Sequence, residues 1–309
     1  MTAPQRAIDY LRQIDTMTIM QTRRDLARTL ITGPLAAVVA KNASAKNMDS
    51  KVDGVIIGAQ SYSFRDRPLD AAIQAYIDCG LSYAELWQGH LEPKNPEILK
   101  QWRTTVPESF FKDVRQKFDN AGVHLVAYNY SFRDNFTDDE IDYGFKMAKW
   151  LGVDKITASS NVATAKRIDP FAKKYKTYVG FHNHASMKPN EFSTPQNFEE
   201  ALKGGSKYLA INLDIGHATA AGWDPVEYLN QHHDRILTLH LKDRTPNHDG
   251  KQGDDVAWGE GTTNIKGALL TLKQHKWSIP ANIEYEYKGT DSVTEVKKCY
   301  EYCRQVLKS

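Results

Sequence analysis

Four short segments of the chain each combine an apolar strand pattern with a side chain that can bind a metal. They read FHNH at residues 181–184, NLDIGH at 212–217, LHLKD at 239–243 and NIEYE at 282–286. They recur about every 25 to 45 residues, the length of one strand, one helix and their connections. In a (β/α) barrel, the C-terminal ends of neighbouring strands meet at one mouth. A His, an Asp, a His and a Glu that meet there form a mixed nitrogen and oxygen site for a divalent cation.

The alternation of strand and helix patterns continues through the whole chain after residue 50. We expect strands at residues 54–63, 83–87, 123–130, 155–159, 177–184, 209–215, 236–241 and 281–287. We expect helices at residues 69–79, 108–120, 138–151, 169–175, 196–203, 225–232, 265–274 and 292–307. Eight such units in about 260 residues match a single (β/α)8 TIM barrel. An open doubly wound sheet is less consistent, because no G-x-G-x-x-G follows the first strand.

Two segments are expected to be loops. Residues 93–107 carry charged residues and several prolines, which punctuate regular structure. Residues 245–261 are rich in Gly and Asp and are expected to form a mobile loop over the mouth of the barrel.

Residues 1–45 have the features of an N-terminal extension followed by a signal peptide. Residues 22–26 read TRRDL, which resembles a twin-arginine export motif, and residues 30–40 form an apolar run too short to span a bilayer. Residues 43–45 read ASA, a candidate cleavage site, so residues 46–309 are expected to form the barrel domain. The pattern predicts export to the periplasm, with an N-terminal amphipathic helix as the alternative. No other segment is apolar enough for stable membrane insertion.

The balance of charge argues against a nucleic-acid partner, and the cysteine spacing argues against a disulfide framework. The chain has 40 Lys and Arg against 38 Asp and Glu, so no basic surplus indicates a nucleic-acid partner. Its three cysteines, Cys79, Cys299 and Cys303, form no C-x-x-C pair. Cys299 and Cys303 share a helical face that does not favour a disulfide between them. We expect buried free thiols, and homo-oligomer formation stays open.

The order and spacing of five segments resemble the sugar phosphate isomerase/epimerase family, which has a xylose isomerase-like TIM barrel. The segments are FHNH at 181–184, LDIGHATAAGWDP at 213–225, LHLKDR at 239–244, WGEG at 258–261 and IEYE at 283–286. The resemblance implies a bound divalent metal ion (Mn, Co, Mg or Zn) held by Glu, Asp, His and Glu at strand ends. It does not specify the substrate, because the family spans isomerases, epimerases, dehydratases and lyases.

Three of these implied metal ligands carry over directly: Asp214, His240 and Glu284. The family's first Glu falls at His182, so this chain departs from the common pattern there. His184 and Glu191 are the other candidates for that position. In the epimerases the two metal-bound glutamates also move the proton, so His182 makes a symmetric two-carboxylate epimerisation less assured.

The same strand ends provide candidates for proton transfer. A metal ion bound to a ketose carbonyl and the adjacent hydroxyl stabilises the enediolate that forms when a C–H proton leaves. Glu284 is the candidate base, and His184, His217 or Lys242 could return the proton or protonate a leaving oxygen. Lys242, two residues after His240, faces the same side of its strand, where its charge suits a developing oxyanion.

Several of these residues also have structural interpretations. Glu85, at the end of the second expected strand, is either a base or a salt-bridge partner in the core. Asp214 could cap the next helix. Glu286 shares the parity of Glu284 and could be a further ligand or a second base. Asp243 is expected to have a structural role, and Trp258 either stacks on a sugar or anchors its loop.

We therefore expect a metal-dependent isomerase or epimerase that acts on a non-phosphorylated sugar or keto-sugar. The alternative is a lyase or dehydratase that expels a β-substituent, for example from a 3-keto-glycoside, since elimination needs one base and one acid. An endonuclease IV-like nuclease needs more metal ligands and a basic DNA-binding face. A sugar-binding or scaffold protein is the third class, and Asp214, His240 and Glu284 argue against it.

Overall fold

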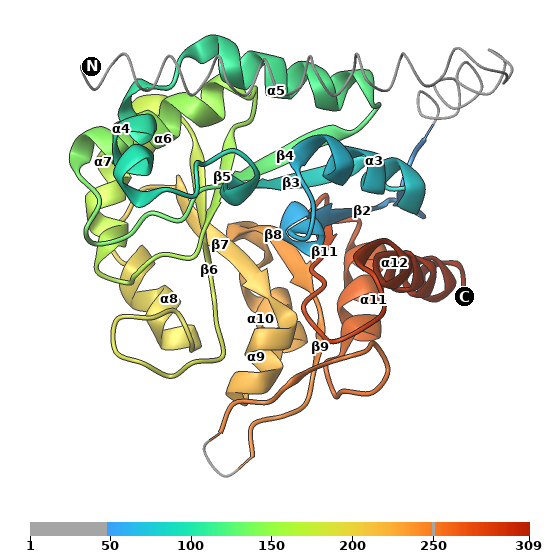
Figure 1. The fold of residues 1–309 in the computed structure, drawn as a ribbon. Helices are drawn as coiled ribbons and strands as arrows, with labels where there is room; N and C mark the ends of the chain where they lie inside the picture. Colours follow the sequence, from blue (N-terminus) through green and yellow to red (C-terminus); the bar gives the residue numbers. More distant parts are fainter. Residues whose placement is uncertain (1–47, 249–250) are drawn as a thin grey trace, which may run out of the picture.

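The computed structural model describes residues 48–248 and 251–309, and in them eight parallel strands close into one barrel (Figure 1). In order around the barrel the strands are β2 (Val55–Gln60), β3 (Tyr83–Trp87), β4 (His124–Asn129), β5 (Lys155–Ala158), β6 (Tyr178–His182), β7 (Leu209–Asp214), β8 (Ile236–Leu241) and β11 (Ala281–Ile283). The barrel closes because β11 and β3 both pair with β2. The predicted single (β/α)8 barrel is confirmed. The predicted signal peptide lies outside the described residues.

Helices cover the outside of the barrel (Figure 1). They are α3 (Leu69–Cys79), α4 (Pro96–Thr105), α5 (Glu108–Asn120), α6 (Asp138–Trp150), α7 (Thr164–Tyr175), α8 (Pro195–Leu202), α9 (Ile215–Ala221), α10 (Pro225–His232), α11 (Ile265–His275) and α12 (Ser292–Lys308). Three 3-10 turns are η1 (Ser61–Phe64), η2 (Gln88–His90) and η3 (His233–Arg235). Short strands outside the barrel are β1 (Lys51–Val52), β9 (Asp243–Arg244) and β10 (Asp255–Val256).

Strand β7 shows how the alternation of side chains builds both the core and the site. Leu209, Ile211 and Leu213 belong to the hydrophobic core outside the strands, where burial of each such side chain contributes about 1.5–3 kcal/mol. Asn212 and Asp214 point to the opposite face, into the barrel, where they contact side chains of neighbouring strands. The polar side chains inside the barrel therefore come from the inward-facing positions of the strands and not from loops.

The segment expected to be a loop at residues 93–107 contains helix α4, so that prediction is wrong. The Asn95 side chain accepts a hydrogen bond from Glu97 N, and Pro96 occupies the first turn, where its missing N–H has no helical partner. Trp102 is buried in the core, and Arg103 Nε lies 2.7 Å from Glu92 Oε1. The prolines here begin and follow a helix instead of preventing one.

Other boundaries differ from expectation at the mouth of the barrel. Helix α7 begins at Thr164, five residues before the expected start, and includes Pro170. Helix α9 follows β7 directly, because Asp214 Oδ1 accepts a hydrogen bond from His217 N and caps it. Strand β11 ends at Ile283, so Glu284 and Glu286 lie beyond the last paired residue.

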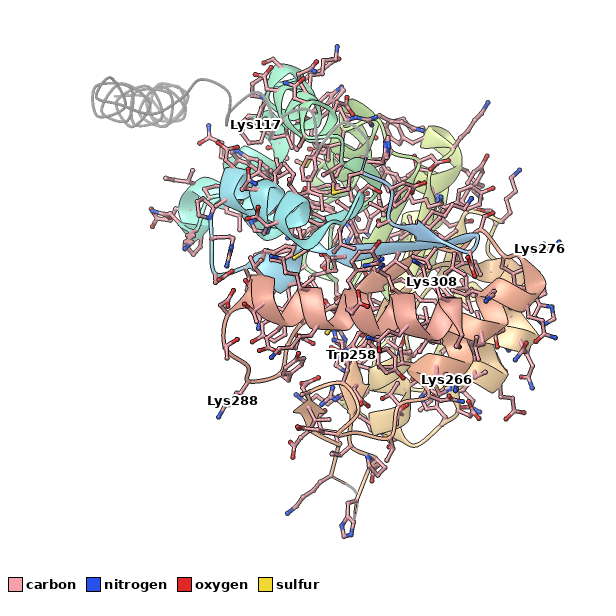
Figure 2. The ribbon with its side chains drawn as sticks, turned by 90° about the vertical axis from the view of Figure 1, so that its right-hand side faces the viewer. Lys117, Trp258, Lys266, Lys276, Lys288 and Lys308 are labelled. Atoms are coloured by element: carbon pink, nitrogen blue, oxygen red, sulfur yellow. The ribbon has the colours of Figure 1, made fainter. Side chains whose placement is uncertain are left out.

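The long segment at residues 245–261 is tied down at both ends. It contains β10, which pairs with β9. The Asp243 carboxylate accepts hydrogen bonds from the backbone N–H groups of Gly259, Gly261 and Thr263, in agreement with its expected structural role. Trp258, labelled in Figure 2, packs edge-on against Tyr302 of α12, so it anchors the segment.

The three cysteines are free and buried, as expected from the sequence. Among residues 48–248 and 251–309, none of the helices combines the length and apolarity that crossing a bilayer requires.

Candidate metal centre

Strand register brings the four candidate ligands to neighbouring inward-facing layers at the C-terminal ends of the strands. Asp214 pairs directly with His240 across β7 and β8. His182 pairs with Asn212, so it lies one inward-facing position below Asp214. His240 pairs with Asn282, which places Glu284 one inward-facing position above it.

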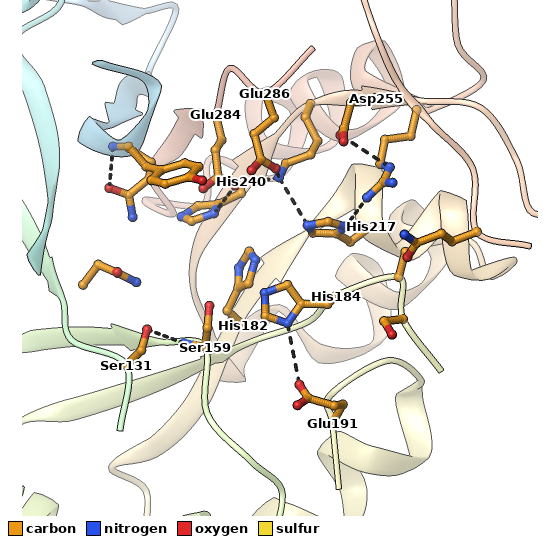
Figure 3. Close-up of a pocket in the computed structure, with 18 of the residues that line it drawn as sticks. Ser131, Ser159, His182, His184, Glu191, His217, His240, Asp255, Glu284 and Glu286 are labelled. Atoms are coloured by element: carbon orange, nitrogen blue, oxygen red, sulfur yellow. Dashed lines mark hydrogen bonds and ion pairs between the residues drawn. The ribbon is translucent and has the colours of Figure 1, made fainter. Parts of the chain in front are cut away.

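One ligand atom from each of His182, Asp214, His240 and Glu284 lies within 4.8 Å of the others. All four side chains are buried. Figure 3 shows the rings of His182 and His240 beside those of His184 and His217. The set offers two imidazoles and two carboxylates, a combination suited to Zn, Mn, Co or Fe. The structure therefore brings together the four residues that the sequence analysis proposed as ligands.

Two buried atoms of the cluster indicate that it fits a cation. His182 Nδ1 has no hydrogen-bond partner among the described residues. Asp214 Oδ2 likewise accepts no hydrogen bond there, although Lys242 Nζ lies 3.1 Å away. Unsatisfied buried polar atoms are rare and costly, at about 1–3 kcal/mol each. A divalent ion bound to His182 Nδ1 and Asp214 Oδ2 would satisfy both atoms.

Asp214 serves two neighbours with its two oxygens. Oδ1 caps helix α9, and Oδ2 faces the cluster. Asp214 can therefore cap helix α9 with one oxygen and bind a metal ion with the other. Burial raises the pKa of Asp214 to about 6, against the opposing charge of Lys242.

His240 lies between two carboxylates. Its Nδ1 is 3.0 Å from Glu284 Oε2, and its Nε2 is 2.9 Å from Glu85 Oε1. Although burial alone lowers the pKa of a histidine, Glu85 and Glu284 hold the pKa of His240 well above its ordinary value. Nδ1 faces the cluster, while Nε2 is held from below by Glu85.

Glu85 is fully buried beneath the mouth and does not line the cavity. Its Oε1 accepts hydrogen bonds from Gln60 Nε2 (2.7 Å) and Thr157 Oγ1 (2.6 Å), and its Oε2 accepts one from Asn282 Nδ2 (2.9 Å). A carboxylate on the far nitrogen of a ligating imidazole fixes its orientation. Of the two sequence interpretations of Glu85, the geometry favours the partner of His240 over a base that reaches substrate.

Lys242 places a buried ammonium among the acidic side chains. Its Nζ lies 2.8 Å from Glu284 Oε2 and also contacts Glu286 Oε2. Burial alone lowers the pKa of a lysine, but Asp214, Glu284 and Glu286 hold the pKa of Lys242 well above its ordinary value. The same pairing, with His240, holds the pKa of Glu284 well below its ordinary value in spite of its burial.

Two further histidines extend the cluster toward the cavity. Nitrogens of His182, His184 and His217 lie within 4.8 Å of one another. Burial, reinforced by the charge of Lys242, lowers the pKa of His184 to about 4 and that of His217 well below its ordinary value. Arg244 donates to His217 Nδ1. His184 and His217 are therefore neutral at pH 7.

Glu191 and Glu286 lie outside the four-residue set. Glu191 Oε2 is 4.0 Å from His184 Nδ1, on the far side of that ring from the cluster (Figure 3). Glu286 contacts Lys242 and lines the cavity. Of the three candidates for the first ligand position, it is His182 that lies with Asp214, His240 and Glu284.

A cavity of about 570 Å³ opens above these residues. The residues at the ends of β6, β7, β8 and β11 line one half of the cavity, which contains its histidines, Lys242, Glu284 and Glu286. The other half comes from the ends of β2 to β5 and includes Tyr62, Trp87, Ser131 and Ser159. Its volume lies within the range of about 300–1,000 Å³ typical of ligand pockets.

Comparison with protein families agrees with this architecture. The sequence model of a family described as the xylose isomerase-like TIM barrel matches residues 73–306. The chain belongs to this family. Solved structures with this barrel include sugar phosphate isomerase/epimerase proteins.

One curated relative and three solved barrels place the family match in context. The uncharacterized protein MJ1311 of Methanocaldococcus jannaschii is 27% identical over 212 residues, 63% of this chain and 70% of that protein. The probable 3-DHS dehydratase AsbF of Bacillus anthracis has a TM-score of 0.60 at 17% identity, over 79% of this chain and 97% of AsbF. A D-tagatose 3-epimerase-like protein has a TM-score of 0.59 at 17% identity, over 82% and 98% of the two chains. The IOLI protein, solved with a bound zinc atom, has a TM-score of 0.58 at 17% identity, over 82% and 95%.

Some residues of this xylose isomerase-like site were not found by sequence reasoning. Gln60 and Trp87 are the last residues of β2 and β3, so their position at strand ends was the available signal. Arg244 follows the LHLKD segment directly. Tyr62 lies in the turn η1, whose conformation no strand or helix pattern predicts.

Proposed function

We propose that the protein is a divalent-metal-dependent isomerase or epimerase of a non-phosphorylated sugar or keto-sugar, acting through an enediolate. The observation that carries the proposal is the buried set of His182, Asp214, His240 and Glu284 with two unsatisfied donor atoms at the base of a cavity. The family and the range of its solved barrels, which include epimerase-like and dehydratase proteins, support an enzyme of this kind.

A divalent ion held by these four residues polarises a sugar carbonyl and the neighbouring hydroxyl when it is bound. Glu284 stays ionised because Lys242 and His240 hold its pKa low. Its carboxylate borders the cavity and accepts the proton from the carbon next to the carbonyl. Lys242 remains an ammonium and stabilises negative charge that develops on the substrate oxygen.

Return of the proton completes the reaction. In isomerisation it returns to the former carbonyl carbon, and in epimerisation it returns to the other face of the carbon that lost it. Neither step needs an oxidant or a reductant. His184 and His217 are neutral and border the cavity on the side of β6 and β7, so they are the groups that can relay this proton.

The same first step followed by loss of a β-substituent defines the alternative, a lyase or dehydratase. One observation favours it specifically. His182 occupies the position of a metal-bound glutamate in the epimerases, so the four-residue cluster offers one glutamate, Glu284, in place of two. In the elimination the C–O bond breaks, and the leaving oxygen takes a proton from Lys242 or a neighbouring histidine.

Deuterium incorporation tests the proposal. The protein, loaded with Mn, Co or Zn, is incubated in D2O with a panel of free ketoses and keto-glycosides, and the products are followed by NMR. Incorporation at the carbon next to the carbonyl is expected with wild type and is expected to be lost in Glu284→Gln. Glu286→Gln is the matched control, because it also contacts Lys242 but lies outside the cluster.

The products distinguish the two reactions, since elimination releases the substituent and epimerisation keeps it. Wild-type incorporation by Glu284→Gln contradicts the role of that carboxylate. Absence of incorporation into every member of the panel by the metal-loaded wild type contradicts the proposed chemistry.

We also propose that the enzyme acts on a small carbohydrate outside the cytoplasm. Support comes from the TRRDL segment, the apolar run and the ASA triplet within residues 22–45. Expression of the full chain followed by cell fractionation is expected to place it in the periplasm, and Arg23→Lys with Arg24→Lys is expected to retain it in the cytoplasm. Periplasmic recovery of that double variant contradicts twin-arginine export.

A further inference from the structure

The half of the cavity away from the metal cluster has an aromatic wall. Trp87 and Tyr62 both line the cavity, and both rings are partly exposed. Their centroids lie 4.9 Å apart with an interplanar angle of 80°, an edge-to-face pair. In the reaction proposed above neither ring transfers a proton or binds the metal ion.

The strand register directs Trp87 to the mouth. Trp87 is two residues after Glu85, so it shares the inward face of β3, one layer above that buried carboxylate. Trp87 pairs with Asn129 of β4, and its backbone N–H donates to Ser61 Oγ at 2.7 Å. The indole is therefore placed by the barrel itself and not by a free loop.

The neighbours of the two rings hold them in position. A Cβ at Gly89 would lie 2.2 Å from Trp87 Cζ2, so only glycine leaves room for the indole there. His90 packs edge-on against Trp87 at 5.5 Å. Arg65 lies over the Tyr62 ring at 4.4 Å and donates from Nη1 to the carbonyl oxygens of Tyr62 and Tyr285. A wall fixed in this way binds a flat ligand with little loss of side-chain entropy.

Apart from Arg133, the polar groups around the wall are uncharged. Gln60, Asn129, Ser131 and Ser159 line this half of the cavity, and Ser159 N donates to Ser131 Oγ at 3.2 Å. Arg133 is the charged residue of this half. Aromatic faces with amide and hydroxyl groups suit a neutral, flat ligand with hydroxyl groups. The other half, in contrast, contains Glu284, Glu286 and Lys242.

A short chain of contacts joins the wall to the metal cluster. Tyr62 N donates to Gln60 Oε1 at 3.3 Å, and Gln60 Nε2 donates to Glu85 Oε1 at 2.7 Å. Glu85 in turn contacts His240 Nε2 at 2.9 Å. Residues of both halves line one cavity of about 570 Å³, and a single sugar ring at the cluster fills only part of it.

We propose that the Trp87–Tyr62 wall is a subsite for a second, uncharged ring joined by a glycosidic bond to the sugar that reacts at the metal cluster. The inference rests on the proposed function for the position of the reacting sugar. It makes the substrate a neutral keto-glycoside, whose ring carbonyl stays free for the enediolate step, with either a second pyranose or an aryl group on the wall, rather than a free monosaccharide.

Binding of glucosides tests the subsite without turnover. Methyl, phenyl and glucosyl glucosides of both anomers are titrated into the full-length protein by calorimetry. For the favoured anomer, the phenyl or glucosyl compound is expected to bind roughly three- to tenfold more tightly than the methyl compound, the gain of one ring-stacking contact. Trp87→Ala is expected to lose this gain.

Trp277→Ala is the matched control. Trp277 stacks between His233 and His275 before β11, outside the cavity, so its variant is expected to keep the gain. Tyr62→Ala is measured in parallel and is expected to lose most of the gain, which keeps the test open if Trp87→Ala does not fold. Circular dichroism and thermal melts of each variant establish folding.

The subsite is overturned by equal affinities of wild type for methyl and ring-bearing glucosides, by a gain that persists in both cavity variants, or by no measurable binding of any glucoside. A gain shown by phenyl glucuronide but not by phenyl glucoside also overturns it, because Arg133 then selects an anion. The deuterium experiment reports on the reaction separately. A ring gain without deuterium incorporation contradicts the proposed function alone, and incorporation without a ring gain contradicts the subsite alone.

Discussion

Lys242 Nζ lies 2.8 Å from Glu284 Oε2, so an ammonium group is part of the cluster in which the metal ligands meet. The same nitrogen lies 3.1 Å from Asp214 Oδ2 and contacts Glu286. One buried ammonium group thus contacts three carboxylates. Burying an ion costs several kcal/mol. The lysine is tolerated here because its positive charge reduces the repulsion among the three carboxylates.

Replacement of Lys242 by Met is expected to destabilise the fold by about 3–5 kcal/mol, because it leaves buried carboxylates without a partner. A divalent ion supplies the missing positive charge, so excess Mn is expected to restore more stability to this variant than to wild type. Urea unfolding with and without Mn measures both effects. Lys298→Met, an exposed lysine paired with Glu295, is the control. A loss that Mn does not reduce contradicts the shared site.

Replacement of Glu85 by Gln is expected to weaken metal binding about 10- to 100-fold, because His240 loses the carboxylate that orients it. Competition with a fluorescent chelator gives the affinity. Glu140→Gln removes another buried carboxylate, at the N-terminus of α6, and is expected to leave the affinity unchanged. Equal affinities of Glu85→Gln and wild type mean that Glu85 does not position His240.

Metal affinity is expected to depend on pH through two groups. Asp214, whose pKa is raised to about 6, is protonated below that pH and ionised above it. His240, whose pKa is well above its ordinary value, carries a proton on each nitrogen at neutral pH and must release the one on Nδ1 to bind. Affinity therefore falls as pH falls, by about tenfold per unit above pH 6 and about a hundredfold per unit below it.

Calorimetric titration with Mn between pH 5 and 7.5, in buffers of different ionisation enthalpy, counts the protons released. Affinity that is constant over this range contradicts the assignment of Asp214 and His240 as ligands. Folding of each sample is checked by circular dichroism, so that acid unfolding is separated from competition by protons.

Asp243→Asn is expected to destabilise the protein by about 2 kcal/mol, since charge-assisted bonds to three backbone N–H groups are weakened. It is also expected to increase proteolysis within residues 257–263. Asp254→Asn, an exposed residue of the same segment, is the control. Wild-type stability and protease resistance of Asp243→Asn contradict the anchoring role.

The barrel and most of the cluster were predictable from the sequence because both depend on periodic patterns. Apolar strands at regular intervals predicted the fold, and Asp214, His240 and Glu284 each lie at or next to the C-terminal end of such a strand. The first ligand position stayed open among His182, His184 and Glu191, because only the pairing of His182 with Asn212 places it at the depth of the cluster.

The parts that were not predictable depend on local geometry and contacts distant in sequence. Helix α4 was missed because Pro96 and Pro107 look like breaks until the cap of Asn95 is seen. Glu85 had two equal interpretations until its contact with His240, 155 residues away, was visible. The aromatic wall depends on contacts at the turns η1 and η2, where Arg65 lies over the Tyr62 ring and Gly89 leaves room for the Trp87 indole.

The metal content of purified protein tests the central claim most directly. After loading with Zn or Mn and removal of free ion, elemental analysis is expected to find about one divalent ion per wild-type chain, held by the His182, Asp214, His240 and Glu284 cluster. Folded Asp214→Ala and His240→Ala are expected to retain almost none, whereas His233→Ala, at the other end of β8, is expected to match wild type. Full metal occupancy in either cluster variant would contradict the account.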